Sequence, residues 1–329
     1  MKKNLIGIDI GGTKCAVTYG IQTGDTLEII EKVKFATSNV TETVESLGRE
    51  TGTMLDRHGL SAADTAAIGI SCGGPLDTKH GIVMSPPNLP GWDNIPVVDL
   101  IGGRFGIRTA VQNDANACAL AEWKFGAGRG CDDLVFLTFG TGLGAGLILN
   151  GRLYDGVNGN AGEAGHIRLA DFGPVGYGKQ GSFEGFCSGG GIAQLARTMA
   201  TEQLQMGRSV SFCRTLRDLP AITAQSVAEA AWRGDALAAE VYALAGRQLG
   251  RGLSMLIDLL NPGRIILGGI FMRAAALLEP HMNAVIRAEA LPAASTACRI
   301  VPAGLGEQIG DYAALSVAAN LAACQQPTD

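Results

Sequence analysis

Apolar residues alternate with glycine-rich turns in two similar stretches of the chain. LIGIDIGGTKCAVTYG begins at Leu5 and LVFLTFGTGLGAGLILNG begins at Leu134; in both, an apolar run leads into a glycine turn and a second apolar run. This pattern predicts a strand, a tight turn and another strand. When Gly11 is aligned with Gly140, the sequence indicates two related halves that each open with the same unit.

Further apolar segments predict an α/β protein. A buried strand is expected in DTAAIGISCGGPLD before a glycine-proline loop, and another in GIRTAVQND, with a helix over about 115–125 after it. An apolar stripe from Asp235 to Leu260 predicts a long helix that ends at Asn261-Pro262-Gly263, and RIILGG predicts one more buried strand. The segment GDYAALSVAANLAA predicts a terminal helix. Strands that alternate with helices in this way are typical of α/β folds.

The composition limits the possible functions. The chain has 329 residues, of which 47% are hydrophobic and 17% charged, enough for two globular lobes. Its net charge of −5 comes with scattered Lys and Arg, so we expect no nucleic-acid partner. Gly7, Asp9 and Gly11 interrupt the first apolar segment, and no apolar run reaches membrane-spanning length, so we expect a cytoplasmic protein with no membrane contact. The eight cysteines include no CxxC pair, which favours reduced thiols.

The two glycine turns are candidate phosphate-binding sites. Glycines without a Cβ let backbone N–H groups approach phosphate oxygens, and the Asp9 carboxylate beside the first turn could orient hydrated magnesium. Either turn alone is more simply an ordinary hairpin. Two of them, with Thr13 and Thr141 as hydroxyl donors, predict a clamp for a polyphosphate such as ATP.

Several polar residues allow both a structural and a functional interpretation. Asp114 follows a predicted strand, where a carboxylate could take a proton from an attacking hydroxyl, but Asp is also a good helix N-cap. Glu163 and His166 are three residues apart and would share a face of a helical turn. Asn88 lies in the proline-rich loop SPPNLPGW, which either presents its amide or is a plain surface loop.

Seven motifs in one order resemble the sugar kinases of the ROK family: DIGGTK, GGPLD, PNLPGW, QNDANACALAEW, FGTGLGAGLILNG, GNAGEAGH and NPGRIILGG. The resemblance covers essentially the whole chain and implies an α/β, two-lobed actin-like and hexokinase-like (ribonuclease H-like) fold with a duplicated core, with ATP and sugar between the lobes. We expect a small lobe of residues 1–117 plus a C-terminal helix 309–329, and a large lobe of residues 118–308.

The resemblance also implies roles for individual residues. It makes the chain an ATP-dependent kinase of glucose or a close hexose, assisted by Mg2+ and often dimeric, in which Asp114 is the base that deprotonates the sugar hydroxyl, most often the 6-hydroxyl. The residues implied in sugar binding are Asn88, Asn113, Asp114, Glu163, His166 and Glu184. Those implied in ATP and phosphate binding are Asp9, Gly11, Gly12, Thr13, Lys14, Gly140, Thr141, Gly142, Gly268 and Gly269, although Lys14 could equally be a solvated turn residue.

Other functions remain as alternatives. Some family members are repressors with a DNA-binding domain before the DxGGTK turn, which we do not expect here because the turn lies so near the start of this sequence. A non-catalytic sugar sensor or pseudo-kinase would need neither Asp9 nor Asp114. An oxidoreductase that binds a dinucleotide at GYGKQG would need a strand before Gly176 and a helix after Gly181, and SFEGFCSGGG is predicted not to be helical.

The segment that contains GYGKQG departs from the family pattern. In most members of the family that this chain resembles, the same place holds the motif CxCGxxGCxE. The resemblance implies that its three cysteines and the His of the ExGH motif bind a structural zinc in those members. This chain has Val175, Tyr177 and Ser182 at the cysteine positions and keeps Glu184. Because a structural zinc takes about four N or S ligands, we expect no zinc, unless Cys187 or another residue supplies a ligand, and we expect packing by Tyr177 and Phe183 to replace it.

Overall fold

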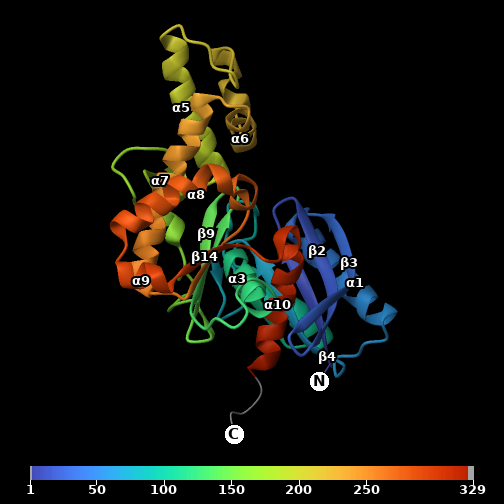
Figure 1. Ribbon diagram of the computed structural model, residues 1–329. Coiled ribbons are helices and arrows are strands. Elements are labelled where there is room, and N and C mark those ends of the chain that lie inside the picture. Colours follow the sequence, from blue (N-terminus) through green and yellow to red (C-terminus); the bar gives the residue numbers. More distant parts are fainter. Residues whose placement is uncertain (1, 325–329) are drawn as a thin grey trace. The chain divides into compact units, whose positions relative to one another are not determined.

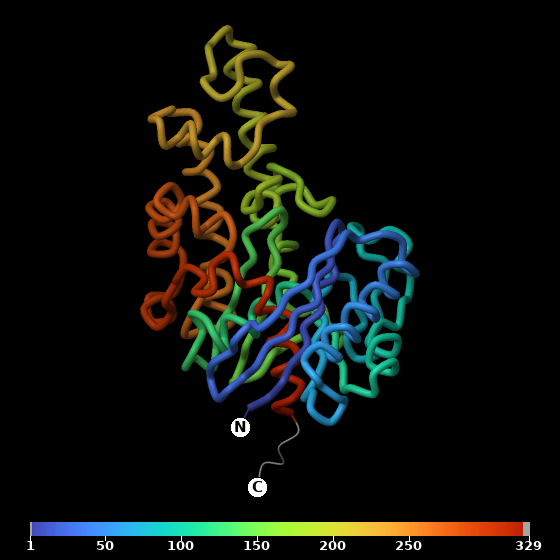
Figure 2. The backbone as a smooth tube through the Cα atoms, turned by 90° about the vertical axis from the view of Figure 1, so that its right-hand side faces the viewer, coloured from blue at the N-terminus to red at the C-terminus, as the bar shows by residue number. Residues whose placement is uncertain are grey.

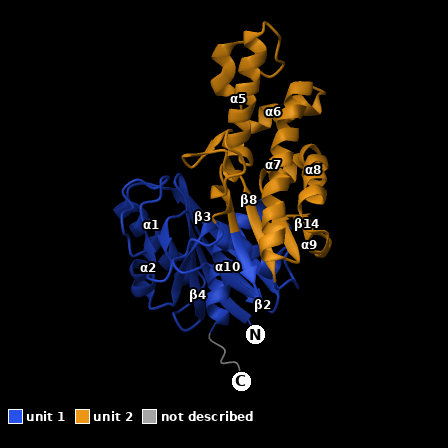
Figure 3. Ribbon diagram, turned by 90° about the vertical axis from the view of Figure 1, so that its left-hand side faces the viewer, with its two compact units in different colours: residues 1–132, 146–162, 304–329 blue, residues 133–145, 163–303 orange. Residues whose placement is uncertain are grey.

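The computed structural model describes residues 2–324 and divides the chain into two compact units (Figure 3). Unit 1 comprises residues 1–132, 146–162 and 304–329, and unit 2 comprises residues 133–145 and 163–303. Residue 1 and residues 325–329, which belong to the expected small lobe, lie outside the described residues. Among residues 2–324, no helix has the length and apolar character that crossing a membrane requires.

Unit 1 is built on a five-stranded sheet with the order β3-β2-β1-β4-β7. Strand β1 pairs antiparallel with β2 and parallel with β4, and β4 pairs parallel with β7. The strands are β1 (Lys2–Ile10), β2 (Lys14–Thr23), β3 (Thr26–Ala36), β4 (Thr65–Cys72) and β7 (Thr109–Asn113), and a small ladder is formed by β5 (Leu76–Asp77) and β6 (Ile82–Val83). The strand, turn and strand predicted around DIGGTK are thus β1, the turn and β2.

The alternation of side chains along β1 assigns its two faces to different layers. Ile6, Ile8 and Ile10 join the core with α1 (Val40–Arg57) and α2 (Val97–Phe105), whereas Leu5 packs with α10 (Ile309–Ala323). The C-terminal helix α10 lies beside the N-terminal strands in both views (Figures 1 and 2). Asp9 therefore belongs to the α10 face of the sheet, where a carboxylate shares its layer with apolar helix residues.

Two glycines let α10 approach the sheet closely. A Cβ on Gly7 would stand 2.8 Å from the backbone N of Leu315, and a Cβ on Gly69 would overlap the carbonyl O of Ala314 and the backbone N of Ala318. Helix α3 (Asp114–Phe125) packs on the same helix. The absence of side chains at these two sheet positions thus sets the separation of α10 from β1 and β4.

A buried carboxylate fixes the chain segment that leads into α10. Glu122 on α3 is fully buried and accepts hydrogen bonds from the backbone N–H groups of Ala127 (2.7 Å), Gly304 (3.0 Å) and Leu305 (2.9 Å). The segment continues through the short 3-10 helix η3 (Gly306–Gln308) into α10. A carboxylate with three N–H donors is well compensated for its burial, so this contact ties α3 to the start of α10.

The boundaries of the two compact units differ from those expected for the two lobes. The expected boundary at residues 117 and 118 falls inside α3, which the structure keeps whole in unit 1. Residues 118–132, 146–162 and 304–308 also belong to unit 1 rather than to the expected large lobe. The physical reason is the packing of α3 on α10, which the apolar pattern of either helix alone did not indicate.

A second five-stranded sheet has the order β10-β9-β8-β13-β14. Its strands are β8 (Leu134–Phe139), β9 (Leu143–Leu149), β10 (Arg152–Tyr154), β13 (Arg264–Leu267) and β14 (Arg299–Pro302). Strand β13 pairs parallel with both β8 and β14. The strand, turn and strand predicted from residue 134 are β8, the turn and β9, and the strand predicted in RIILGG is β13.

The long helix predicted from Asp235 to Leu260 is present in unit 2. Helix α7 (Ala236–Leu260) is capped by the Asp235 side chain and ends at Asn261 in the left-handed conformation. Gly246 and Gly250 of α7 face carbonyl groups of α8 (Ile270–Glu289), which allows a close helix crossing. The other helices are α5 (Gly189–Gln205), α6 (Ala224–Trp232), α9 (Pro292–Ala297) and the 3-10 helix η2 (Leu216–Ala221).

The segment 175–191 differs from its prediction. A hairpin of β11 (Val175–Gly176) and β12 (Lys179–Gln180) is followed by the short helix α4 (Phe183–Phe186) and then by α5. The prediction that SFEGFCSGGG is not helical was wrong, because Ser182 and Ser188 each accept an N-terminal amide hydrogen bond and start a helix. The hairpin and the four-residue helix are not the long strand and helix of a dinucleotide fold.

We predict that Gly69→Ala destabilises the protein by about 2 kcal/mol or more, because overpacking against helix backbone cannot be relieved by a rotamer change. Urea unfolding should show the loss. Gly103→Ala, inside α2 and with open space around its Cβ position, is the matched control and should be neutral or slightly stabilising. Equal stability of the two variants would contradict the prediction.

Candidate active site

Three neighbouring parallel strands of unit 1 end in the same row of the sheet. Ile10 of β1 pairs with Cys72 of β4, and Cys72 pairs with Asn113 of β7. The residues that follow are the glycine turn at 11–12, the Gly73-Gly74 loop and Asp114, so the parallel register brings three predicted motifs to one edge. The carboxyl edge of such a sheet is where α/β proteins bind ligands.

The proline-rich loop lies on this edge as well. A Cβ on Gly12 would overlap the carbonyl O of Asn88, and a Cβ on Gly73 would stand 3.5 Å from the Asn88 amide. The Asn113 amide approaches Gly74 in the same way, with its Nδ2 3.2 Å from the position of a Cβ there. The structure therefore gathers Asn88 and Asn113 beside these glycines, and at Gly12 the absence of a side chain is needed for the contact.

The DIGGTK turn is held by a residue that sequence reasoning missed. The hydroxyl of Thr37, just after β3, donates to the carbonyl O of Gly11 at 2.6 Å, and its backbone N–H donates to the carbonyl O of Thr13 at 3.1 Å. Thr13 and Lys14 themselves are exposed. No local pattern marked Thr37, because its role depends on the pairing of β2 with β3.

Asp114 is the first residue of α3, and the N-cap is its neighbour Asn113. The Oδ1 of Asn113 accepts from the Ala115 N–H at 2.8 Å, and the Oδ1 of Asp114 accepts from the same N–H at 2.8 Å. The residue that caps α3 is thus Asn113, and not Asp114 as the structural interpretation of the sequence suggested. Asp114 is exposed, and desolvation by the protein around its carboxyl group raises the pKa of that group above its usual value, an effect that the Ala115 N–H partly offsets.

Asp9 has the second perturbed carboxyl group of this edge. Burial raises the pKa of Asp9 to about 6, and the negative charge of Asp114 adds to the increase. Lys32 and Lys34 on β3 lower it, but Lys32 also forms an ion pair with Asp311 of α10. Two carboxyl groups of raised pKa, one of which raises the pKa of the other, form a site that favours a proton or a cation.

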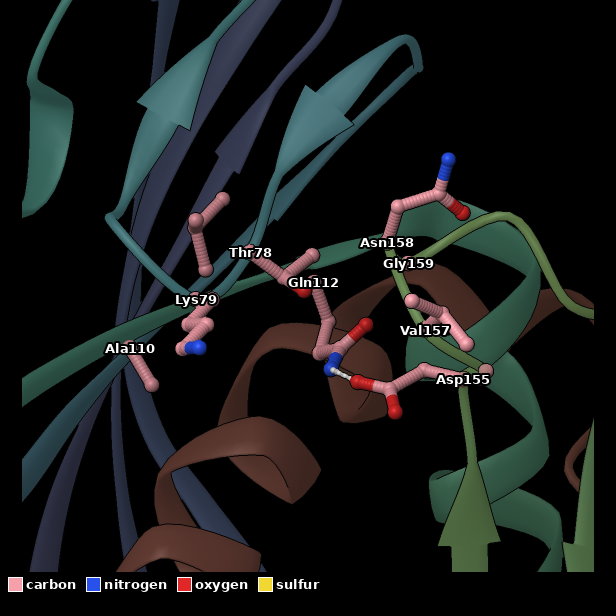
Figure 4. Close-up of a pocket in the computed structure, with 10 residues that line it drawn as sticks. Thr78, Lys79, Ala110, Gln112, Asp155, Val157, Asn158 and Gly159 are labelled. Atoms are coloured by element: carbon pink, nitrogen blue, oxygen red, sulfur yellow. Dashed lines mark hydrogen bonds between the residues drawn. The ribbon is translucent and has the colours of Figure 1, made fainter.

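A hollow of about 340 Å³ in unit 1 lies beside this edge and contains none of the predicted site residues (Figure 4). It is lined by Thr78 and Lys79, residues 110–112 of β7 and the loop 155–159. The Nε2 of Gln112 donates to Asp155 at 3.3 Å (Figure 4). The Oε1 of Gln112 accepts from Asn116 at 3.2 Å. Gln112 directly precedes Asn113, so the hollow and the predicted residues share one strand.

The second glycine turn joins β8 to β9 in unit 2. The Gly140 N–H donates to the carbonyl O of Gly142 at 3.0 Å, and the Leu143 N–H donates to Glu184 Oε2 at 3.0 Å. A Cβ on Gly142 would stand 2.7 Å from that same Glu184 oxygen. Glu184, implied in sugar binding, is therefore held by the turn that carries Thr141.

Two helices of unit 2 begin beside this turn. The N–H of Gly189, the first residue of α5, donates to the carbonyl O of Gly140 at 2.8 Å. Gly269, the N-cap of α8, has φ +61°, and a Cβ there would overlap the carbonyl O of Phe139. The positive ends of both helix dipoles thus lie near the turn, which suits bound phosphate. Sequence reasoning missed Ser188, although Ser before Gly-Gly-Gly is a recognisable N-cap signal.

Glu163 and His166 flank the short 3-10 helix η1 (Ala164–His166), in which the His166 N–H donates to the carbonyl O of Glu163 at 3.1 Å. Gly165 lies against Leu143, and a Cβ there would stand 3.3 Å from the Glu184 Cβ. The 163–166 turn, Glu184 and the turn at residues 140–142 therefore form one neighbourhood within unit 2.

The structure brings the predicted residues together in two groups, one on each unit. Unit 1 carries Asp9, Gly11, Gly12, Thr13, Lys14, Asn88, Asn113 and Asp114. Unit 2 carries Gly140, Thr141, Gly142, Glu163, His166, Glu184, Gly268 and Gly269.

Comparisons with known proteins agree on one family. A model of the ROK family matches residues 5–321. A glucokinase of Halalkalibacterium halodurans is 31% identical over 314 residues, which cover 93% of this chain and 92% of that protein. The N-acetylglucosamine repressor of Escherichia coli O157:H7 is 30% identical over 262 residues, which cover 79% of this chain and 62% of the repressor.

A solved structure agrees with this assignment. A ROK family glucokinase from Streptomyces griseus, in complex with glucose and AMPPNP, superposes with a TM-score of 0.71 at 31% identity, covering 98% of this chain and 99% of the other. The expected α/β, hexokinase-like fold class is thereby confirmed. Because the family model spans nearly the whole chain and a relative of similar length is 31% identical, this chain belongs to the ROK family.

Proposed function

We propose that this chain is an ATP-dependent hexose kinase that phosphorylates glucose or a close relative at the 6-hydroxyl, with Asp114 as the general base. The observation that carries the proposal is the position of Asp114, a carboxyl group of raised pKa at the shared carboxyl edge of β1, β4 and β7. The similarity to glucokinases, one of them solved with glucose and AMPPNP, supports the choice of substrates.

In this mechanism Asp114 takes the proton of the sugar hydroxyl while the hydroxyl oxygen attacks the γ-phosphorus of ATP. The bond between that phosphorus and the β–γ bridging oxygen breaks, and ADP leaves. A raised pKa makes the ionised carboxylate a stronger base than an ordinary aspartate. The hydrogen bond from the Ala115 N–H fixes the Oδ1 of Asp114 and leaves the other oxygen for the proton. General-base help of this kind contributes about 10²–10⁴-fold.

The residues around Asp9 fit a hydrated magnesium ion. Asp9 and Asp114 are two carboxylates whose charges are not fully compensated, as the pKa of about 6 at Asp9 shows, and Mg2+ usually binds through one or two carboxylates and its own waters. When bound with ATP, the ion would neutralise charge on the transferring phosphoryl group. In the proposal, Gly11 and Gly12 with Thr13 and Lys14 contact phosphate, as do residues 140–142.

The sugar is assigned to polar residues of both units. Asn88 and Asn113 in unit 1, and Glu163, His166 and Glu184 in unit 2, hydrogen-bond the hydroxyls that are not phosphorylated. Gly268 and Gly269 accompany the adenosine. The proposal includes a cytoplasmic homodimer without a nucleic-acid partner, as the family resemblance and the net charge of −5 imply.

The similarity to the E. coli repressor favours a second candidate, a sugar sensor or pseudo-kinase that binds ligand without phosphoryl transfer. A sensor needs no carboxyl group of raised pKa at the sheet edge, which is why we prefer the kinase. A coupled assay of ADP release with glucose, mannose, fructose, allose and N-acetylated amino sugars separates the two. Sugar-dependent ADP release supports the kinase, and sugar binding without it supports the sensor.

We predict that Asp114→Asn lowers kcat by about 10²-fold or more, because the amide cannot accept the hydroxyl proton. ATP affinity, measured by calorimetry, should change little. Asp56→Asn, at an exposed position of α1, is the control and should match the wild type. Turnover near normal in Asp114→Asn would rule out its role as base.

We also expect the catalytic rate to fall in acidic solution. Burial raises the pKa of Asp114 above its usual value, and it raises the pKa of Asp9 at the same edge to about 6. Asp9 therefore gains a proton at a higher pH than an ordinary aspartate, and Asp114 is shifted in the same direction. We predict that kcat/KM falls as the pH decreases below about 6, rather than below about 4 as for a free aspartate. A profile that stays flat down to about pH 5 would contradict this.

The ionised carboxylate of Asp9 should lower the free energy of unfolding at neutral pH. Its folded pKa of about 6 lies above the unfolded value near 3.8, so the folded state binds the proton more tightly and loses stability as the pH rises between these values. We predict that Asp9→Asn raises the free energy of unfolding by about 1–2 kcal/mol at about pH 8, and that the gain narrows towards about pH 5. Urea unfolding without ATP or Mg2+ measures it, and the variant should be catalytically impaired. An unchanged difference across this range would contradict the assignment.

A further inference from the structure

The hairpin of β11 and β12 is tied to α5 by one side chain. The Val175 N–H donates to the Oε1 of Gln194 at 3.0 Å, and the Nε2 of Gln194 donates to the Val175 carbonyl O at 2.9 Å. The amide therefore satisfies both backbone groups of Val175 as a neighbouring strand would. Val175 occupies the first of the three positions at which the family pattern has cysteine.

The other end of the hairpin holds the turn that carries His166. The Nζ of Lys179 donates to the His166 carbonyl O at 2.6 Å, and the Tyr177 ring meets the His166 imidazole edge-on, with 5.3 Å between the ring centroids. The Phe183 N–H donates to the carbonyl O of Ile167 at 2.7 Å. Backbone and ring of His166 are thus each contacted by a residue of the hairpin.

Ser182 occupies the third cysteine position and is completely buried. Its Oγ accepts from the Gly185 N–H at 3.0 Å and caps α4, the helix whose second residue is Glu184. The side chain of Phe183, also completely buried, lies against Gly252 of α7. Glu184 accepts the hydrogen bond from the Leu143 N–H. The helix that carries Glu184 is held at its start by the Ser182 cap and on its buried side by Phe183.

The residues present do not fit a zinc site. Among residues 2–324, no cluster of three or more His, Cys, Asp or Glu side chains could hold a metal ion. Cys187, the remaining thiol of the segment, is buried with its Sγ 3.6 Å from the carbonyl O of Ala245, and burial raises its pKa well above the usual value. A cysteine binds zinc as its thiolate, the form that the burial of Cys187 disfavours.

We propose that Gln194, Lys179 and Ser182 are positioning residues that orient His166 and Glu184 for the sugar without a metal ion. Gln194 fixes the hairpin to α5, Lys179 fixes the hairpin to the turn that carries His166, and Ser182 caps α4, which carries Glu184. Together these contacts hold His166 and Glu184 in position within unit 2. Their effect on a sugar rests on the proposed function, whereas their effect on loop order does not.

The experiment uses the whole chain with Lys179→Ala and Gln194→Ala. Matched controls are Lys2→Ala, at an exposed lysine of β1, and Gln205→Ala, at the exposed end of α5. We expect each test variant to raise the KM for the best hexose about three- to tenfold, the usual effect of losing one structural hydrogen bond, with little change in kcat or in the KM for ATP. Lys179→Arg, which keeps a donor of similar reach, should restore most of the affinity.

Hydrogen exchange separates this proposal from the proposed function. Amides of residues 163–167 and 175–184 should exchange faster in both test variants and as in the wild type in both controls, even if no hexose is phosphorylated. Protein purified without added metal should contain less than about 0.1 zinc per chain, and a chelator should leave the exchange unchanged. Stoichiometric zinc, exchange that a chelator accelerates, or test variants that behave as the controls would each overturn the proposal.

Discussion

The parallel register of β1, β4 and β7 is the constraint on which the unit 1 site depends. Because Ile10, Cys72 and Asn113 fall in one row, three loops far apart in the sequence leave the sheet at the same edge. A slip of one residue would turn Asp9 away from α10 and move Ile8 and Ile10 out of the α1 and α2 core, so the apolar alternation of β1 enforces the register. The register that buries the apolar residues of β1 is therefore the same register that positions the candidate site residues.

The same edge concentrates negative charge. Burial raises the pKa of both Asp9 and Asp114, and the charge of Asp114 raises that of Asp9 further. Lys32 and Lys34 offset the shift at Asp9 only in part, and Lys32 also pairs with Asp311. Two carboxyl groups kept close in this way are unfavourable in the free protein. A site that becomes favourable only with a bound cation or proton is typical of ligand-binding machinery rather than of a structural turn.

Much of the fold was readable from local patterns, and the reasons for the failures are specific. The two strand-turn-strand units, the helix that ends at Asn261 and the strand β13 all have short-range signals in apolar period, glycine and caps. The assignment of α3 to unit 1 has none, because it depends on the contact of α3 with α10 and on the hydrogen bonds of Glu122. Thr37 and Gln194 were likewise invisible, since each acts on a segment that only the folded chain brings near it. The cap at Asn113 shows a subtler limit: the sequence placed the helix start to within a residue, but the cap that it offered was Asp114, whereas the structure uses Asn113.

The covering of the unit 1 sheet by α10 has a consequence for synthesis. Strand β1 is made long before α10, the helix that begins at Ile309 and covers one of its faces. Leu5 and Gly7 therefore have no contact with Leu315 until the residues between them have been translated. At about 5–20 residues per second this interval lasts some tens of seconds, during which an apolar sheet face stays open to solvent. The residues of unit 2 are all translated before α10 is complete. The core around β1 can therefore close only after the residues of unit 2 have been made.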